Sequence, residues 1–425
     1  MLSQSEQPKR VAVIGGGVAG IVCADLLQHQ SDVTLFEQND YLGGHTHTIE
    51  IPDGPDAGLP VDTGFIVLND KTYPTFQAFL ARLGVDTSSS EMSFGFQCRQ
   101  SGLVYAGTSL NGLFARRRNV AKPGFYAFLF EISRFCKRAR TDLAIGQVPR
   151  GTLGEYLAAG RFSRFMIENY LEPMAAAIWS TPTVQVKDFP AEPFLRFFEN
   201  HGLLSVRDRP QWKTVVGGSH AYVKAFQRHF KGSCYLGTPI REVRRESGGV
   251  RVIPSGGEAK SFDRAVLATH ADQALCLLKD ADPLETRLLA PWRYQRNHAV
   301  LHTDTSVLPR QRHAWAAWNF SRGTDDSGRP VFVTYYMNRL QSFSAKRDYC
   351  VTLNCDADFQ PDTVIAEMDY HHPLYTRESM ATQPELHRLN GRNHTFFCGS
   401  YFGYGFHEDA VKAGVAAAKV LEGGP

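Results

Sequence analysis

The chain of 425 residues has none of the features of a membrane-spanning or disulfide-stapled protein. No apolar run reaches the roughly 18 residues needed to cross a bilayer, and Met1 to Arg10 is polar, unlike a signal peptide. Its eight cysteines are scattered, with no Cys-x-x-Cys pair and no Cys/His spacing typical of a metal site. These absences predict a cytoplasmic protein in a reducing compartment, without a metal site.

The net charge of the chain is also small. The chain has 46 Lys and Arg against 43 Asp and Glu, a formal charge of +3. A nearly neutral chain without a nucleic-acid-binding motif is not expected to bind nucleic acid. Neither a Gly-x-Ser-x-Gly elbow nor a Walker loop is present. The length of the chain exceeds that of a usual single hydrophobic core, so two domains are expected.

The strongest positive signal lies near the N-terminus. An apolar run at 11–14 leads into Gly15-x-Gly17-x-x-Gly20, a helix-forming segment at 21–27, and a second apolar run that ends at Glu37. This is the pattern of a βαβ unit that binds a dinucleotide. Gly15 permits the turn, Gly17 lets the backbone approach a pyrophosphate, and Gly20 allows close helix–strand packing. The helix N-terminus offers N–H groups to phosphate, and Glu37 can accept hydrogen bonds from ribose.

Two further segments are typical of the same domain. One contains strand patterns at 240–243, 250–253 and 263–269, and the other contains a strand at 395–399 and an Ala-rich helix at 408–421. The sequence therefore predicts an α/β fold in which residues 1–69, 212–290 and 392–425 form a Rossmann-like domain. Residues 70–211 and 291–391, rich in aromatics and arginine, form a discontinuous mixed α+β domain that builds the substrate site.

Several motifs extend the dinucleotide pattern. After Glu37 come Leu42-Gly43-Gly44-His45 and Asp62-Thr63-Gly64-Phe65, and near the C-terminus comes Gly405-Phe406-His407-Glu408-Asp409. Together they resemble the flavin-containing amine oxidase and phytoene desaturase superfamily, which implies an amine-oxidase-type domain that binds FAD. The resemblance assigns cofactor contacts to Gly15, Gly17, Val18, Ala19, Gly20, Glu37, Gly43, Gly44, His45, Gly64, Phe65, Ile240, Ala268, Thr269, Gly399, Phe406, His407 and Glu408.

The implied roles differ among these positions. Gly43 and Gly44 complete the pyrophosphate cradle, and His45 stands where relatives have an arginine, which weakens the phosphate contact or makes it depend on pH. Gly64 and Phe65 run under the flavin ring, and the backbone of Ile240 pairs with adenine. The helix that begins near His407 points at the flavin, where its dipole stabilises the reduced ring. Cys398 is expected to be a core residue and not a covalent flavin anchor.

A narrower resemblance covers nearly the whole chain. Motifs such as 105–114, 200–204 and 400–408 are similar to a bacterial branch of flavin-binding oxidoreductases found beside cyclopropane-fatty-acid synthases. Phe406 aligns with a cage tyrosine of amine oxidases and lacks its hydroxyl. We therefore expect an FAD-dependent oxidoreductase that removes hydride from carbon of an apolar acyl lipid, by desaturation or other remodelling. Amine oxidation, redox-neutral double-bond isomerisation and an accessory role beside a lipid methyltransferase stay open, and no catalytic base or oligomeric state is assigned.

A helix-like stretch from Leu113 to Arg140 interleaves eight basic residues with bulky aromatics. This composition suits the surface of an anionic membrane and places the protein peripherally at the inner membrane face. The alternative is a helix that packs its aromatics inside the second domain and leaves its arginines in solvent.

Overall fold

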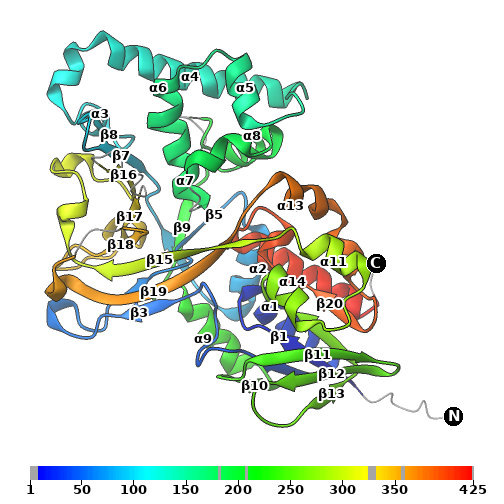
Figure 1. Ribbon diagram of the computed structural model, residues 1–425. Coiled ribbons are helices and arrows are strands. Elements are labelled where there is room, and N and C mark those ends of the chain that lie inside the picture. The colour runs from blue at the N-terminus through cyan, green and yellow to red at the C-terminus, as the bar shows by residue number, and fades with distance from the viewer. Residues whose placement is uncertain (1–7, 180–182, 206–208, 324–331, 356–358, 424–425) are drawn as a thin grey trace.

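The computed structural model describes residues 8–179, 183–205, 209–323, 332–355 and 359–423. In these ranges, one domain is built on a parallel five-stranded sheet in the order β10-β2-β1-β14-β20 (Figure 1). Its strands are β1 (Lys9–Ile14), β2 (Ser31–Phe36), β10 (Ser233–Tyr235), β14 (Arg264–Leu267) and β20 (Thr395–Phe397). The predicted strands at 263–269 and 395–399 are both present, each shorter than expected. The α/β class predicted from sequence is confirmed.

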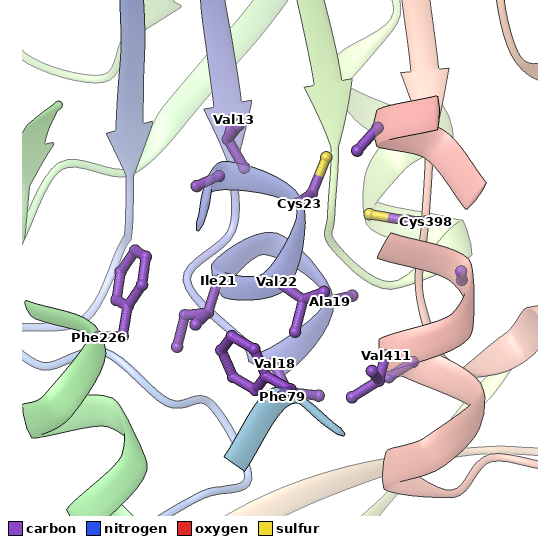
Figure 2. Packing of buried hydrophobic residues seen from close by; sticks show 14 of the residues in the cluster. Val13, Val18, Ala19, Ile21, Val22, Cys23, Phe79, Phe226, Cys398 and Val411 are labelled. Atoms are coloured by element: carbon purple, nitrogen blue, oxygen red, sulfur yellow. The ribbon is translucent and has the colours of Figure 1, made fainter. Parts of the chain in front are cut away.

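Both faces of this sheet are buried, as expected for parallel strands. In β1, Val11 and Val13 face one hydrophobic cluster while Ala12 and Ile14 face another, following the two-residue period of a strand. Figure 2 shows the first cluster, where Cys23 and Cys398 lie close together in the core. The burial expected of Cys398 is confirmed. This face is covered by α1 (Val18–Leu27), α2 (Pro74–Leu83), α9 (His220–His229) and α14 (His407–Leu421).

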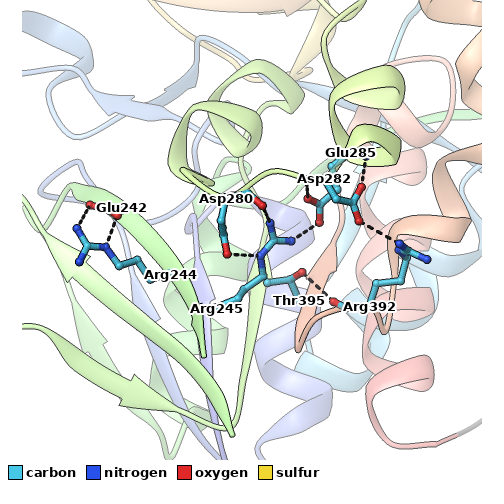
Figure 3. Close-up of polar contacts among 8 residues, drawn as sticks. All are labelled: Glu242, Arg244, Arg245, Asp280, Asp282, Glu285, Arg392 and Thr395. Atoms are coloured by element: carbon cyan, nitrogen blue, oxygen red, sulfur yellow. Dashed lines mark hydrogen bonds and ion pairs between the residues drawn. The ribbon is translucent and has the colours of Figure 1, made fainter. Parts of the chain in front are cut away.

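The opposite face carries a small antiparallel sheet and two helices. The strands predicted at 240–243 and 250–253 are present as the antiparallel pair β11 (Ile240–Glu246) and β12 (Gly249–Pro254). They are followed by β13 (Lys260–Phe262), α10 (Ala271–Leu277) and α11 (Pro283–Leu289). Arg245 on β11 reaches across to Glu285 on α11 at 2.5 Å and to Asp280 at 3.1 Å (Figure 3). Because Arg245 and Glu285 are both buried, this pair holds the hairpin against α11.

The second part of the molecule is organised around a mixed seven-stranded sheet within the described residues, in the order β19-β15-β18-β17-β16-β7-β8. Its strands are β7 (Phe94–Cys98), β8 (Val104–Ala106), β15 (Tyr294–His302), β16 (Trp318–Arg322), β17 (Phe332–Tyr336), β18 (Cys350–Leu353) and β19 (Val364–Pro373). Helices lie above it in Figure 1. These are α3 (Leu110–Leu113), α4 (Pro123–Ala144), α5 (Leu153–Ala159), α6 (Arg164–Met166), α7 (Glu172–Trp179) and α8 (Ala191–Asn200).

Short elements connect the two parts. β5 (Val67–Asn69) and β6 (Thr87–Ser89) both pair with β9 (Trp212–Val215), and β3 (Thr48–Glu50) pairs with β4 (Pro60–Asp62). Helix α2 packs into the core of the parallel-sheet domain, although the expected boundary at residue 69 assigns it to the other domain. The other domain boundaries stay a prediction. The remaining helices are α12 (Met337–Leu340) and α13 (Arg377–Thr382).

The single helix suggested for Leu113 to Arg140 is wrong. Helix α3 ends at Leu113, a 3-10 turn covers Arg117–Ala121, and α4 begins at Pro123. Proline has no backbone N–H and disfavours helical conformation in the residue before it, so it fits the first turn of a helix and breaks the interior of one. Among the described residues, α4 and every other helix are too short or too polar to span a bilayer.

Candidate functional site

The glycine turn after β1 separates the roles of its three glycines. A Cβ on Gly15 would lie 2.5 Å from the carbonyl oxygen of Ala268, and a Cβ on Gly20 would collide with the carbonyl oxygen of Gly15. A Cβ on Gly17 would meet nothing within 4 Å. The chain itself thus requires glycine at Gly15 and Gly20, whereas the space beside Gly17 is left open at the N-terminus of α1.

Glu37 lies at the end of β2 and is buried. Its Oε2 accepts a hydrogen bond from the Gly16 N–H at 2.7 Å, and its Oε1 accepts one from the Asn39 N–H at 2.9 Å. The carboxylate therefore ties the glycine turn to the loop after β2, and its remaining lone pairs are available to a hydroxyl.

The Gly43-Gly44 pair closes on the same turn. The Gly43 N–H donates to the Gly16 carbonyl at 2.8 Å, and a Cβ on Gly44 would lie 3.3 Å from the Gly17 Cα. Both residues have positive φ, 126° and 59°, a conformation that favours glycine. The structure thus brings two glycine-rich segments that are well separated in sequence to the open space beside Gly17.

Next to this pair, His45 belongs to a group of four histidines that we call the histidine group: His45, His270, His371 and His372. The His45 ring centroid lies 5.1 Å from that of His372 and 6.4 Å from that of His270, and His270 stacks on Tyr294 at 4.1 Å. Burial and, to a smaller extent, neighbouring imidazoles lower the pKa of His45 to about 4 and the pKa of His270 and His372 to about 3. These three rings are therefore uncharged at neutral pH.

His372 also has a defined tautomer. The side-chain amide of Asn297 donates to its Nδ1 at 2.7 Å, so the ring hydrogen is on Nε2. Within the described ranges, no set of three or more His, Cys, Asp or Glu side chains could hold a metal ion.

The start of α14 is enclosed by aromatic side chains. His407 stacks on Phe65 with ring centroids 3.7 Å apart, and its Nε2 lies 2.9 Å from the Tyr222 hydroxyl. Tyr222 in turn lies 2.6 Å from the Thr46 hydroxyl. Burial lowers the pKa of His407 to about 3, which makes it a fourth uncharged imidazole near His45.

The two carboxylates at the start of α14 accept hydrogen bonds from backbone N–H groups. Both carboxylate oxygens of Glu408 accept N–H groups at the start of α2, from Thr75 at 3.0 Å and Phe76 at 2.8 Å. Asp409 accepts the N–H groups of Tyr404 and Phe406. The Glu408 side chain therefore faces α2, and only its backbone remains at the helix start where a cofactor contact is predicted.

Phe406, the residue before α14, forms a stack with Phe197 of α8 and His201, the residue after α8. Its ring lies 4.6 Å from Phe197 with an interplanar angle of 18°, and Phe197 lies 3.9 Å from His201. The His201 Nδ1–H donates to the Phe197 carbonyl at 2.9 Å, and burial lowers the pKa of His201 to about 4. We call Phe406, Phe197 and His201 the aromatic stack. It presents uncharged rings.

The other predicted contacts lie around these features. Ala268 and Thr269 contact the turn at Gly15, and Gly399 lies beside Thr269. A Cβ on Gly64 would collide with the His45 carbonyl, so the chain's own packing requires this glycine, independently of any flat ring. Val18 and Ala19 form the buried first turn of α1. Ile240 lies at the start of β11.

Sequence reasoning missed several residues at this site. No role at this site was predicted for His201, His270, His371 or His372. His270 directly precedes α10, His371 and His372 lie on β19, and His201 directly follows α8. All four are far from the glycine motifs in sequence. A run such as His371-His372 shows no local sign that folding brings it to His45.

The chain matches the family described as flavin containing amine oxidoreductase over residues 18–348. It is 26% identical over 346 residues to AofH of Mycobacterium tuberculosis, named as a flavin-containing monoamine oxidase, covering 76% of this chain and 70% of that protein. It is 24% identical to an L-amino-acid oxidase of Siganus canaliculatus, covering 77% of this chain and 61% of that one.

Solved structures with the same fold include a fatty acid isomerase from P. acnes that produces CLA, with a TM-score of 0.67 and 16% identity. That match covers 97% of this chain and 98% of the isomerase. Another is cyclohexylamine oxidase from Brevibacterium oxydans, with a TM-score of 0.69 and 16% identity, covering 98% and 100%. At this identity the likeness shows the fold alone.

Proposed function

Because the chain belongs to the flavin-containing amine oxidoreductase family and is an FAD-dependent oxidoreductase, we propose that it oxidises an apolar acyl chain. When bound, FAD accepts a hydride from a substrate carbon. Loss of a proton from the adjacent carbon would then leave a double bond in the acyl chain. The chain's own residues bind and orient the two reactants.

The proposed FAD site lies along the glycine turn and the Gly43-Gly44 pair. Support comes from the open space at Gly17, which suits a pyrophosphate at the N-terminus of α1. Support also comes from Glu37, a buried carboxylate at the ribose position of the βαβ pattern. The remaining contacts with the flavin ring and adenine stay predictions.

Replacing Glu37 with alanine is expected to lower FAD affinity by about 1–3 kcal/mol, roughly 5- to 150-fold, because charge-assisted hydrogen bonds are lost. The change also leaves the Gly16 and Asn39 N–H groups without their acceptor. Fluorescence titration of the apoprotein with FAD measures the affinity. Glu37→Gln, which keeps one acceptor oxygen, should lose less. Equal affinity in all three proteins would mean that the ribose lies elsewhere.

The observation that carries the acyl proposal is the aromatic stack. Phe406, Phe197 and His201 belong to, or pack against, one hydrophobic cluster that continues through Phe194, Phe198 and Leu204. Phe406 has no hydroxyl, and the carboxylate of the nearby Asp409 is taken up by two backbone N–H groups. Such a wall suits a hydrocarbon, since burying a polar amine there requires compensating hydrogen bonds.

There are two rival activities. The monoamine oxidase and L-amino-acid oxidase relatives favour amine oxidation as one rival. Double-bond isomerisation, in which the hydride is returned to the substrate, is the other. Substrate panels distinguish all three, because each leaves the flavin and the product in different states.

The test is anaerobic mixing of the holoenzyme with unsaturated or methyl-branched acyl lipids, or with monoamines, in detergent. We expect the acyl lipids alone to bleach the flavin, with a product two hydrogens lighter by mass spectrometry. Bleaching by amines alone would overturn the proposal in favour of amine oxidation. An isomeric product of unchanged mass, without net flavin reduction, would replace oxidation by isomerisation.

Phe406→Tyr is expected to raise KM for the acyl substrate roughly fivefold or more with unchanged flavin content, since an unpaired hydroxyl buried against Phe197 costs about 1–3 kcal/mol. Steady-state or single-turnover kinetics measure this. Phe343→Tyr, a partly buried phenylalanine in another cluster, is the matched control. An unchanged KM in Phe406→Tyr would remove the aromatic stack from the substrate site.

A further inference from the structure

The outer surface of the second domain carries an unusual concentration of exposed apolar side chains. Leu110 is 77% exposed and Phe130 is 70% exposed, and Val120, Tyr126 and Phe165 are each about half exposed. They lie on α3, the 3-10 turn, α4 and α6, at the end of the molecule opposite the parallel sheet (Figure 1). The Tyr126 hydroxyl donates to the Val120 carbonyl at 2.9 Å and its ring lies 5.9 Å from Phe114, so the turn and the helix form one surface.

This surface is also basic. Residues 113–140 contain eight Lys and Arg and one carboxylate, Glu131. Several of these cations are already used: Arg134, Arg138 and Arg140 pair with Glu131, Asp142 and Glu199, and Arg116 donates to the Gly102 carbonyl. Arg117 donates to the neutral side-chain oxygen of Asn111 at 3.2 Å. For Arg117, Arg118, Lys122 and Lys137, no carboxylate of the described chain lies within ion-pair distance. Three of the four lie immediately around Val120.

The opposite face of α4 leads inward. Phe125, Phe128 and Phe135 belong to the same hydrophobic cluster against which Phe406 packs. One face of α4 therefore presents aromatics and cations to solvent, and the other joins the apolar interior that reaches the aromatic stack.

We propose that this surface, Leu110, Val120, Tyr126, Phe130 and Phe165 with Arg117, Arg118 and Lys122, docks on an anionic lipid bilayer. We assign an anionic bilayer as the binding partner because this surface combines cations with exposed apolar side chains. Unpaired cations suit anionic headgroups, and large exposed rings beside them suit the interfacial region of a bilayer. Docking on a bilayer would bring the enzyme to acyl lipids, and this purpose alone rests on the proposed function.

Flotation of the holoenzyme with vesicles tests the proposal. We expect binding to phosphatidylglycerol/phosphatidylcholine vesicles and much weaker binding to pure phosphatidylcholine. Each cation near such a surface contributes on the order of a fivefold change in partition, so R117E/R118E/K122E should bind roughly 100-fold less. R228E/K231E/R241E, three exposed cations on the other domain, should bind like the unaltered protein.

A second pair of variants keeps the test independent of charge. L110S/F130S should bind at least severalfold less, whereas L236S/V420S, which alters exposed apolar residues elsewhere, should not. Flavin content and melting temperature verify that each variant is folded. Failure of the unaltered protein to float, or equal loss in the control variants, would overturn the proposal. A dimer in light scattering that the surface variants abolish, without vesicle binding, would instead assign the surface to a second copy. Flavin reduction by acyl lipids in detergent needs no vesicles, so the two proposals fail separately.

Discussion

Gly17→Val is expected to yield a folded protein that has lost its flavin. A Cβ at Gly17 enters space that the chain leaves open, so we expect the apoprotein to tolerate the substitution. It then occupies the proposed position of the FAD pyrophosphate. Overpacking costs about 1–3 kcal/mol where surroundings can yield. A pyrophosphate held on a rigid helix N-terminus cannot move away, so FAD affinity should fall by more than roughly 100-fold. The flavin absorbance per chain measures the loss of FAD, and the circular dichroism spectrum measures whether the protein is folded.

Two controls make this result specific. Gly20→Val should fail to fold, because its Cβ collides with the Gly15 carbonyl. Gly248→Val, at a glycine with equally open surroundings in the β11–β12 turn, should retain flavin. Full flavin content in Gly17→Val would show that the pyrophosphate lies elsewhere.

Acidification is expected to destabilise the flavin-free protein steeply as the pH falls from about 6.5 toward 4. His45, His270, His372 and His407 are held uncharged in the fold, with pKa values of about 4, 3, 3 and 3, whereas an unfolded histidine titrates near 6.5. The unfolded state therefore binds more protons in this window. The stability contribution is present above pH 6.5 and is lost as the pH falls, by roughly 1–3 kcal/mol per histidine at pH 4.5.

Bound FAD should reduce this loss. Its diphosphate favours a protonated imidazole at His45, so the melting temperature of the holoprotein should fall less between pH 7 and pH 5 than that of the apoprotein. Burial raises the pKa of Asp62 to about 7 and that of Asp409 to about 6. These two carboxyl groups therefore oppose the effect of the histidines, because their contribution to stability increases as the pH falls. Differential scanning calorimetry of His45→Asn and His270→Phe isolates the imidazole contribution, with exposed His387→Gln as the control. An identical pH dependence in the variants and the parent would contradict the prediction.

Short-range pattern alone predicted the parallel-sheet domain around the glycine turn. The glycine turn, the helix after it, the acid at Glu37 and the helix at 408–421 each depend on contacts within a few residues or on strict spacing, and the structure has each of these elements near its predicted place. The same local reasoning failed between Leu113 and Pro123. It followed composition there and gave too little weight to the helix break that proline imposes.

Only the tertiary structure decided what surrounds the predicted site. It set His270 and His372 beside His45, joined Phe406 to Phe197 and His201, and turned the Glu408 carboxylate toward α2. It also divided the basic residues of 113–140 into those with carboxylate partners and those without. These contacts join segments separated by tens to hundreds of residues. They depend on sheet register and helix packing, which no single segment specifies, because a side chain's neighbours are chosen by the whole fold and not by its own stretch of sequence.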